Sequence, residues 1–364
     1  MVAIDGLNPT DPGVLLLSTV AARRRNSSTV LAYCGDIPGA PEDAVRLILD
    51  VRERVGSAHT CQAASLDPSC SPHALTLGSF ATALCWPRPH LGKEFTLRTL
   101  AEAGLLLADG GELYCAARKK KGGKTLALAM RALMGQTETI ARKHGYHLYR
   151  SIRTRAFDET LARTYATRFL RFADTALGEF ELETTPGVFS HRGLDAGTRC
   201  LIEHLEHLEH VRAQAPTSEP SYCIDLCSGV GPLAIWWAKR WSANSVLAIE
   251  TNVLAAAMIR RNADRLGIGK RLTVRNGDGL DRADPVCAPL LGSCEIALCN
   301  PPTHASPEEL ARLLGELRPF MARDAAAHIV VNRPGSATAA LEQSGARLQV
   351  FPYPGYTVLT ARWS

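Results

Sequence analysis

Short apolar runs, each followed by a polar or glycine-containing turn, recur through the second half of the chain. They occupy residues 222–226, 245–249, 272–274 and 296–299, and longer amphipathic segments follow several of them. An apolar run of this length between turn residues predicts a buried strand, and the amphipathic segments predict helices. Alternation of the two predicts an α/β domain with a doubly wound, Rossmann-like sheet.

The first half of the chain carries a second copy of this pattern. Ala-Leu-Cys-Trp-Pro-Arg-Pro-His at 83–90 closely matches Ala-Leu-Cys-Asn-Pro-Pro-Thr-His at 297–304, with Trp86 in the place of Asn300. Each copy precedes an expected helix and strand, at 95–107 and 112–116 in the first half and at 308–321 and 327–331 in the second. The repeat predicts two tandem domains of the same fold.

Upstream of the first copy, residues 28–33, 44–55 and 59–64 predict a strand, a helix and a strand. The first half lacks a turn of the form Asp-x-x-x-Gly-x-Gly, and Gly-Asp-Ile-Pro-Gly at 35–39 is its nearest equivalent. Because it also lacks the Asn, we interpret the first half as a degenerate copy of the second.

A glycine-containing turn follows the first strand of the second half. Asp225 stands near the end of that strand, and Cys227-Ser228-Gly229-Val230-Gly231-Pro232 leads into a predicted helix. Glycines in a strand–turn–helix unit let the backbone approach a nucleotide closely. The full dinucleotide spacing and the Walker Gly-Lys-Ser/Thr are both missing, so the turn alone is a weak signal.

Three further polar residues follow predicted strands, where open α/β sheets bind their ligands. Glu250 lies 25 residues after Asp225, the spacing at which a carboxylate binds ribose hydroxyls. Asp278 follows the third strand and is positioned to accept from an adenine amino group. The combination predicts an S-adenosylmethionine site. Its expected residues are Asp225, Cys227, Ser228, Gly229, Gly231, Glu250, Asp278 and Asn300.

Asn300, Pro301 and Pro302 are the expected catalytic residues. An Asn amide oxygen and a neighbouring Pro carbonyl can each accept a hydrogen bond from an exocyclic amino group and hold its nitrogen toward an electrophile. The two prolines stiffen the turn. This arrangement suits in-line methyl transfer to an amino nitrogen, which needs placement more than a strong base or a metal.

The composition is that of a soluble globular protein, with 46% hydrophobic and 21% charged residues in 364. No apolar run approaches the length of a membrane span, and no basic segment followed by an apolar core marks the N-terminus, so we expect neither membrane association nor a signal peptide. The 11 cysteines are odd in number and form no CxxC pair. They are interpreted as small buried residues in a reducing cytoplasm, not as a disulfide framework or a zinc site.

Positive charge is concentrated in the middle of the chain. Residues 118–171 contain 14 Lys and Arg and three acidic residues, which gives this segment a net charge of +11. Since the whole chain has a net charge of +5, the rest of the chain has a net charge of −6. Lys119, Lys120, Lys121 and Lys124 form its densest part. Such a cluster is typical of a surface that binds RNA, although charge runs also occur as solvated faces.

The expected helix after residue 195, with Asp195 as its N-cap, contains His204, His207 and His210. Their spacing drifts around a helix and no Cys or Asp completes a ligand set, so they predict a polar helical face and no metal site.

Three blocks resemble the bacterial ribosomal RNA guanine-N2 methyltransferases of the RsmC and RlmG type. They are Pro-Gly-Val-Phe-Ser through Leu-Asp-Ala-Gly-Thr at 186–198, the turn at 225–231, and Asn-Pro-Pro at 300–302. The segment from Trp86-Pro87 through Gly-Gly-Lys at 122–124 to Gly-Tyr at 145–146 also resembles the family's degenerate domain, so the resemblance covers nearly the whole chain.

The resemblance implies two tandem Rossmann-like domains, with a degenerate structural or RNA-binding domain at 1–175, a connecting segment and helix at 176–220, and a catalytic domain at 221–364. It implies S-adenosylmethionine-dependent methylation of the N2 amino group of a guanine in ribosomal RNA. The partner would be ribosomal RNA or a ribosomal subunit, and the enzyme would act as a cytoplasmic monomer without a metal.

Two departures from the family pattern leave the acceptor open. Thr303 stands where the family usually carries an aromatic residue that stacks on the base, so Phe189 or Tyr356 would have to supply that surface. Cys227-Ser228 replaces the commoner Gly-Cys or Gly-Ser. One alternative is a methyltransferase for a small-molecule or protein amide or amino acceptor. Another is a non-catalytic RNA-binding protein.

Overall fold

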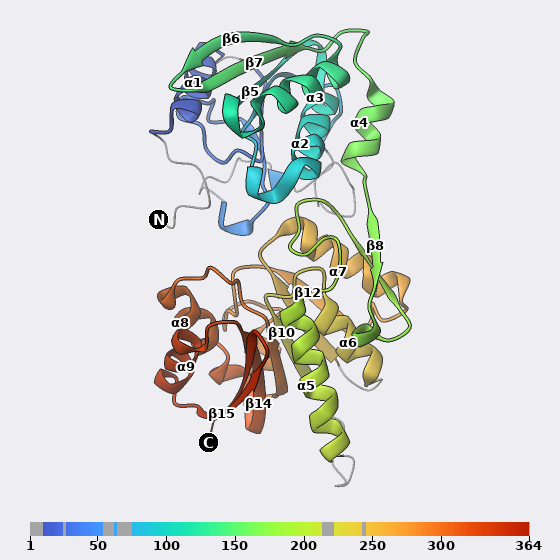
Figure 1. The fold of residues 1–364 in the computed structure, drawn as a ribbon, viewed down its shortest axis with the longest axis vertical. Helices are drawn as coiled ribbons and strands as arrows, with labels where there is room; N and C mark the ends of the chain where they lie inside the picture. The colour runs from blue at the N-terminus through green and yellow to red at the C-terminus, as the bar shows by residue number, and fades with distance from the viewer. Residues whose placement is uncertain are drawn as a thin grey trace. The chain divides into compact units, whose positions relative to one another are not determined.

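The computed structural model describes residues 10–24, 27–53, 62–63, 75–212, 222–241 and 245–363. Contacts within the chain divide it into two units (Figure 1). Unit 1 contains Met1–Phe169 and Thr185–Gly187, and unit 2 contains Leu170–Thr184 and Val188–Ser364. The division falls close to the expected limit at residue 175, and most of the expected connecting segment belongs to unit 2.

Unit 1 is built on a seven-stranded sheet with the order β3-β2-β1-β4-β5-β7-β6. Its first five strands are parallel, and β7 runs antiparallel to both of its neighbours. The strands are β1 (Thr29–Ala32), β2 (Val45–Leu47), β3 (Gln62–Ala63), β4 (Phe80–Cys85), β5 (Leu107–Arg118), β6 (Glu138–Lys143) and β7 (Tyr146–Ile152).

Unit 2 repeats this topology in the order β12-β11-β10-β13-β14-β16-β15. A separate hairpin, β8 (Leu170–Ala173) with β9 (Glu181–Thr184), precedes it. The strands of the main sheet are β10 (Tyr222–Leu226), β11 (Ser245–Glu250), β12 (Leu272–Asn276), β13 (Cys294–Cys299), β14 (Met321–Val331), β15 (Arg347–Tyr353) and β16 (Tyr356–Arg362). Two sheets with one strand order confirm the tandem doubly wound domains that the sequence predicts.

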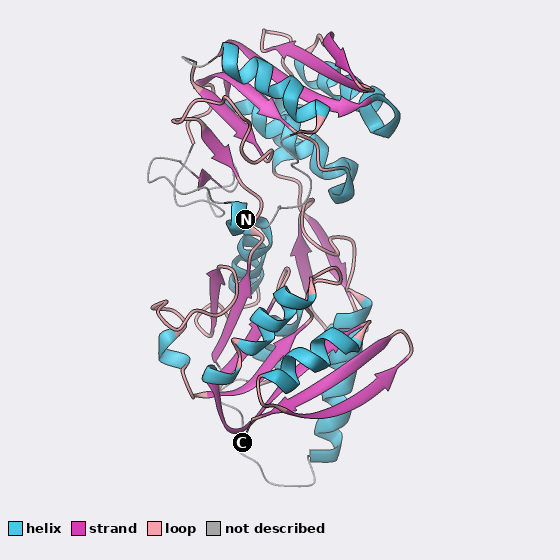
Figure 2. Ribbon diagram, turned by 90° about the vertical axis from the view of Figure 1, so that its left-hand side faces the viewer, coloured by secondary structure: helices cyan, strands magenta, loops and turns pink. Residues whose placement is uncertain are grey.

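Helices cover these sheets (Figure 2). In unit 2, α5 packs on β14 and β16 and α6 and α7 pack on β10, β11 and β12, while α8 packs against α9. The α-helices are α1 (Pro12–Arg23), α2 (Gly92–Leu106), α3 (Lys124–Met134), α4 (Glu159–Ala166), α5 (Ala196–Arg212), α6 (Pro232–Arg240), α7 (Val253–Arg265), α8 (Pro307–Gly315) and α9 (Pro334–Gln343). Shorter turns are η1 (Val51–Glu53), η3 (Pro89–Leu91), η4 (Lys119–Gly123), η5 (Thr175–Leu177), η6 (Ala288–Leu290) and η7 (Arg318–Phe320).

The central strands of each sheet are buried on both faces, which explains their continuous apolar runs. In unit 2, Ile224 of β10, Ala297 of β13 and Ile329 of β14 pack with Leu314 and Leu341 from the helical layer. Cys85, Cys223, Cys287 and Cys299 are buried free thiols, as expected for small core residues.

The prediction of a helix at residues 44–55 is wrong. The chain forms the strand β2 and the turn η1 there. The run contains the β-branched residues Val45, Ile48 and Val51, and an apolar run of this length fits a doubly buried parallel strand as well as a helix. Arg46 is buried within it and donates to Asp36 at 2.7 Å, so a basic residue in the run does not mark a solvent-facing helical position.

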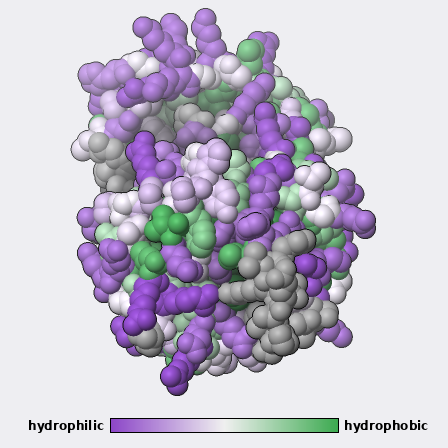
Figure 3. All heavy atoms as spheres, turned by 60° about the horizontal axis from the view of Figure 1, so that its bottom comes forward, coloured by the Kyte–Doolittle hydropathy of each residue, from purple (hydrophilic) through white to green (hydrophobic). Residues whose placement is uncertain are grey.

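Hydrophobic side chains form small separate areas among hydrophilic ones on the face shown in Figure 3. Exposed large apolar residues such as Val350 and Leu291 are scattered along the chain, which is ordinary for a protein surface. None of the described helices combines the length and hydrophobicity needed to cross a bilayer.

Candidate functional site

The site lies where the strand order of unit 2 changes direction. From β10 the chain proceeds to β11 and β12 on one side, and then to β13 and β14 on the other. Ligands of open α/β sheets bind at the carboxyl ends of the strands at such a switch point. Leu226 pairs with Cys299 in the parallel register, so the turn after β10 and the Asn-Pro-Pro turn after β13 begin side by side.

The turn after β10 has an unusual backbone. Cys227, Gly229 and Gly231 have φ angles of 64°, 58° and 87°, which lie in the left-handed region. Ser228 holds this turn in place because its hydroxyl donates to the Asp225 carbonyl at 2.7 Å and accepts from the Ile249 N–H at 3.1 Å. The two glycines adopt these angles at little energetic cost because they lack a Cβ, whereas the Cβ of Cys227 makes its positive φ sterically unfavourable.

Asp225 lies beneath this turn and is fully buried. Its Oδ2 accepts from the backbone N–H of Ala234 at 3.0 Å, in the first turn of α6. Burial raises the pKa of Asp225 to about 8, although the hydrogen bonds from Ala234 and Ser228 oppose the shift. The side chain therefore ties the end of β10 to the start of α6.

Glu250 connects the ends of β10 and β11. Its Oε2 accepts from the N–H of Gly229 at 2.6 Å, and its Oε1 accepts from the N–H of Asn252 at 2.8 Å. An ionised carboxylate has about four lone-pair directions, so each oxygen can accept a second hydrogen bond from a ribose hydroxyl. The chemistry of this position fits the role expected for Glu250.

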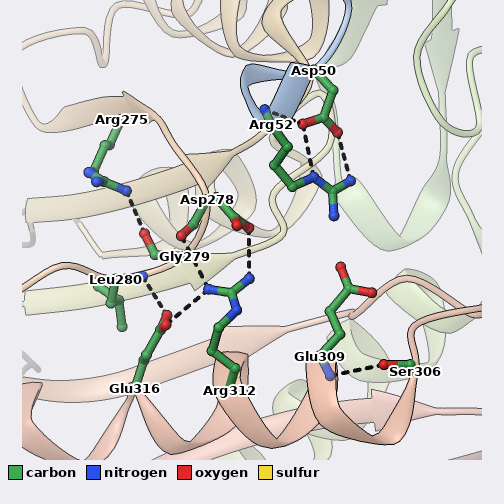
Figure 4. Close-up of polar contacts among 10 residues, drawn as sticks. All are labelled: Asp50, Arg52, Arg275, Asp278, Gly279, Leu280, Ser306, Glu309, Arg312 and Glu316. Carbon is green, nitrogen blue, oxygen red and sulfur yellow. Dashed lines mark hydrogen bonds and ion pairs between the residues drawn. The ribbon is translucent and has the colours of Figure 1, made fainter. Parts of the chain in front are cut away.

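Asp278, at the end of the next strand, is held by α8 (Figure 4). Arg312 donates to its Oδ1 at 2.8 Å and to its backbone carbonyl at 3.3 Å, and also pairs with Glu316 at 2.9 Å. The Asp278 side chain remains partly exposed, at 38%. The helix that follows the Asn-Pro-Pro turn thus fixes the carboxylate expected to meet the adenine.

The amide of Asn300 is oriented by two residues at the start of α5. Its Nδ2 donates to Oδ2 of Asp195 at 2.8 Å and to Oγ1 of Thr198 at 2.9 Å. A carboxylate can only accept, so it selects the NH2 end of the amide. The amide oxygen is left to accept from another group. Asp195 also accepts from the Thr198 N–H at 3.0 Å, which confirms it as the expected N-cap.

The proline turn presents a second acceptor. The carbonyl of Pro302 accepts from the N–H of Ala305 at 3.0 Å and closes the turn. Pro301 is buried and its carbonyl is not used in that closure, whereas Pro302 is exposed. The turn-closing hydrogen bond therefore does not use the Pro301 carbonyl, which is the second acceptor expected from the sequence.

A cavity of about 300 Å³ opens beside Asn300. Phe189, Thr303 and Tyr356 all line it, so the two aromatic residues expected to replace the missing base-stacking residue lie in the same cavity as Thr303. Phe189 is 63% exposed and offers a ring face to a ligand. Asn332 and Arg333, directly after β14, also line this cavity and were not among the residues expected from the sequence.

The expected substrate lysines lie in unit 1. Lys119, Lys120 and Lys121 belong to η4 and Lys124 begins α3, and all four are exposed. Within the described part of the chain they form no ion pair, whereas Arg150, Arg153, Arg163, Arg168 and Arg171 are paired with acidic residues. Part of the basic excess is therefore neutralised locally. The four lysines belong to an exposed remainder that also includes Arg118, Arg131, Arg142, Lys143 and Arg155.

The prediction that the three histidines lie on a polar face of the helix is wrong for His204. His204 is buried, contacts the Tyr353 hydroxyl at 2.7 Å and packs on Phe351, while His207 is exposed. Burial lowers the pKa of His204 to about 4, so its ring is neutral. His210 lies outside the residues whose side chains are described. Among the described residues no cluster of His, Cys, Asp and Glu has the arrangement of a metal site.

The sheet order, the switch-point turns and the oriented amide together define a methyltransferase of the doubly wound type. The model of the methyltransferase small domain family matches residues 179–360, which is half of the chain, and the chain belongs to this family.

Curated relatives support the same grouping. The chain is similar to ribosomal RNA small subunit methyltransferase C of Pseudomonas putida, with 28% identity over 62% of this chain and 60% of that protein. The protein of the same name from Pseudomonas entomophila is 28% identical over 54% of this chain and 52% of its own length. The matches thus span about half to three-fifths of these relatives.

The fold of the whole chain is also similar to a solved structure. The T. thermophilus 16S rRNA N2 methyltransferase RsmC, solved with AdoMet and guanosine, superposes with a TM-score of 0.76 at 17% identity. The match covers 98% of this chain and 92% of that one. The resemblance to the RsmC type that the sequence predicts is confirmed.

Proposed function

We propose that this protein transfers a methyl group from S-adenosylmethionine to the exocyclic N2 nitrogen of a guanine in ribosomal RNA. The observation that carries the proposal is the orientation of Asn300, whose NH2 end is held by Asp195 and Thr198. The amide oxygen of Asn300 remains as a hydrogen-bond acceptor, and an exocyclic amino group is a hydrogen-bond donor that matches it. The similarity to methyltransferases named for ribosomal RNA supports the choice of substrate.

The residues after β10, β11 and β12 fit S-adenosylmethionine. Gly229 and Gly231 allow close approach of the cofactor to the turn, Glu250 has acceptor capacity for the ribose hydroxyls, and Asp278 has a second carboxylate oxygen for the adenine amino group. Asp225, Cys227 and Ser228 would act by fixing the turn. When bound, the cofactor supplies an electrophilic methyl group on a good leaving group.

The protein's own part in the reaction is to hold and orient the amino group. The Asn300 amide oxygen and the Pro301 carbonyl would each accept one N2 hydrogen. This arrangement favours pyramidal geometry, in which the nitrogen lone pair is withdrawn from the ring and becomes nucleophilic. Because the amide is already fixed by Asp195 and Thr198, little reorganisation is needed. The proton released after methyl transfer passes to solvent.

The target guanine would be unpaired or flipped out, because a paired N2 cannot reach such a cavity. Phe189 and Tyr356 would flank the base, with Phe189 supplying the ring face that Thr303 lacks. The exposed lysines of unit 1 would bind the phosphate backbone. The proposal includes a monomer that acts in the cytoplasm on ribosomal RNA or a ribosomal subunit.

The Asn300→Ala variant tests this assignment. We expect its methylation rate to fall by about 100-fold or more, the scale observed when one preorganised polar group is removed from a reacting centre. Cofactor affinity, measured by calorimetry, should stay close to that of the parent protein. An unchanged turnover would contradict the role of Asn300, and turnover without any RNA would favour a small-molecule or protein acceptor.

A further inference from the structure

Unit 1 contains a cavity of about 340 Å³ at the end of its own sheet. It is lined by Asp11, Trp86, His90, Arg118, Lys121 and Tyr146, among others. The lining combines two large aromatic rings with basic side chains.

This cavity is the duplicate of the cavity beside Asn300. Ala32 pairs with Cys85 as Leu226 pairs with Cys299, so Trp86 occupies in unit 1 the position that Asn300 occupies in unit 2. Asp11 caps α1 as Asp195 caps α5.

Two further positions follow the same correspondence. Tyr146 begins β7 as Tyr356 begins β16, and both tyrosines line their cavities. Gly13 and Gly197 each stand two residues after the capping Asp, and each is in close contact with the tyrosine and with the residue that follows the fourth strand. Four positions therefore correspond between the two units, and three of them, the Asp, the Tyr and the residue after the fourth strand, line both cavities.

The catalytic and cofactor groups have been replaced in unit 1. Trp86 has no amide oxygen to hold an amino group. Leu47 pairs with Ala32 as Ile249 pairs with Leu226, so the buried Ile48 stands at the position of Glu250. Without a ribose-binding carboxylate and an amide acceptor, unit 1 keeps the shape of an acceptor site and loses its chemistry.

The aromatic residues of the cavity are arranged for stacking. The Trp86 ring is half-buried and lies 5.8 Å from Tyr146, with an angle of 26° between the planes. The Tyr146 hydroxyl donates to Asp11 at 2.7 Å and accepts from Nε of Arg118 at 2.8 Å, which fixes the ring. A Cβ at Gly13 would approach the Trp86 ring to 2.3 Å, so this glycine makes room for it.

Positive charge surrounds the opening. Arg118 and Lys121 are exposed and line the cavity, and the exposed Lys119, Lys120 and Lys124 are close to them in the chain, in η4 and at the start of α3. Arg88 also lines the cavity but is buried in an ion pair with Glu53 at 2.8 Å, so its charge is already compensated. Stacking rings beside uncompensated lysines are the features with which proteins bind unpaired nucleotides.

We propose that this cavity of unit 1 is a non-catalytic binding site for an unpaired nucleotide of RNA. The base stacks on Trp86, and Arg118 and Lys121 contact the phosphates on either side. The inference shares with the proposed function the premise that the ligand is RNA, but it concerns binding and needs no methyl transfer. Unit 1 would then hold one nucleotide of the substrate while unit 2 modifies another.

The first test measures binding of a short fluorescein-labelled single-stranded RNA to the full chain by anisotropy. Trp86→Ala should weaken binding by about 5- to 150-fold, the effect of losing one stacked base. Trp86→Phe should retain most of the affinity because Phe keeps a ring face. Leu128→Ala removes an exposed apolar residue of α3 in the same unit and should bind like the parent protein. Melting curves check that each variant is folded.

A second measurement identifies the contact directly. RNA carrying 5-iodouridine should photocrosslink to a peptide that contains Trp86 or Tyr146. Crosslinks confined to unit 2, or a folded Trp86→Ala variant with parental affinity, would overturn the proposal. A loss on Arg118→Gln and Lys121→Gln together with no loss on Trp86→Ala would also overturn it, since binding would then rest on charge alone.

The outcome is separable from that of the proposed function. Trp86→Ala should still bind S-adenosylmethionine with the affinity of the parent protein. Ring-dependent RNA binding without methyl transfer to any RNA would support this cavity and contradict the proposed function. If Trp86→Ala transfers methyl groups to RNA with the KM and kcat of the parent protein, the proposed function is supported and the binding site in unit 1 is contradicted.

Discussion

At the scale of single residues, the orientation of the Asn300 amide depends on partners about a hundred positions earlier in the chain. Asp195 and Thr198 share its two N–H donors. Thr198 is buried and is not among the residues that line the cavity, whereas Asp195 is one of them. Both are positioning residues for the Asn300 amide.

The Asp195→Asn and Thr198→Val variants test this dependence. An Asn at 195 no longer selects the NH2 end of Asn300, so the amide populates both orientations and kcat should fall by about tenfold, or about 1.4 kcal/mol. KM for RNA should change little. Thr198→Ser keeps the hydroxyl and should retain parental kcat. A loss of kcat in Thr198→Ser together with a parental kcat in Thr198→Val would show that packing of the methyl group, and not the hydrogen bond, is what matters.

The raised pKa of Asp225 should make the stability of the protein depend on pH. Its pKa is raised to about 8 in the folded protein, so between about pH 4 and 8 the folded state holds a proton that the unfolded state has released. The free energy of unfolding therefore falls as pH rises through this window, by at most about 1.4 kcal/mol per pH unit.

The Asp225→Asn variant should lose this slope while it keeps an oxygen to accept from Ala234. Urea denaturation followed by Trp fluorescence at several pH values measures the difference, since Trp236 and Trp237 lie in α6 next to the site. Parallel pH profiles for the variant and the parent protein would contradict a protonated Asp225.

At the scale of elements, α5 is attached to the antiparallel edge of the sheet through His204. The imidazole meets the Tyr353 hydroxyl of β15 and packs on Phe351. Because α5 also carries Asp195 and Thr198 at its start, this attachment positions the residues that orient Asn300.

His204→Ala should destabilise unit 2 by about 2–3 kcal/mol, because it leaves a cavity and removes a partner of Tyr353. His207→Ala, on the exposed side of the same helix, is the matched control and should change stability by less than about 0.5 kcal/mol. Thermal and urea unfolding measure both. Equal effects would show that His204 contributes no specific contact.

The His204 ring also predicts a loss of stability in acid. Its folded pKa is lowered to about 4, so the unfolded state binds an extra proton between about pH 6.5 and 4. Stability from this residue is present above pH 6.5 and is lost as pH falls. His204→Ala should remove this dependence, and Asp225→Asn should not.

The sequence predicts most of the elements, for reasons that differ between them. Doubly buried strands such as β10 and β13 appear as apolar runs, and the repeat around Trp86 and Asn300 identifies the duplication. The segment at 44–55 fails because its apolar spacing suits a strand or a helix, and only pairing with β1 decides between them.

The partners of the site are harder to predict from one sequence. Asn300, Pro301 and Glu250 are visible at strand ends because turn chemistry is local. The contact from Asn300 to Asp195 joins residues 105 positions apart, and no local pattern encodes it. The duplicate Asp-x-Gly at 11–13 and 195–197 is a signal that could have indicated it, since both copies cap a helix beside the residue after the fourth strand.

At the scale of the whole molecule, we propose that the two units have different tasks, modification in unit 2 and RNA binding in unit 1. Unit 2 holds the residues proposed to bind the cofactor and the oriented amide of Asn300. Unit 1 has the same sheet order, lacks the corresponding carboxylate and amide, and carries the exposed lysines. Duplication followed by loss of chemistry in one copy leaves a second surface for a large substrate.

Replacing Lys119, Lys120, Lys121 and Lys124 by Gln tests the contribution of that surface. Each lysine that contacts a phosphate should reduce the slope of log affinity against log salt by up to about 0.7. The affinity for S-adenosylmethionine should not change. Lys239→Gln with Lys270→Gln removes exposed charges from unit 2 and serves as the control. An unchanged salt slope in the unit 1 variant would assign RNA binding to another surface.

The central claim is tested most directly by transfer of a labelled methyl group to naked ribosomal RNA and to isolated ribosomal subunits, followed by nucleoside analysis. The account predicts N2-methylguanosine as the labelled product, formed by the parent protein and not by Asn300→Ala. Absence of label in every RNA, with S-adenosylmethionine still bound by the protein, would contradict it.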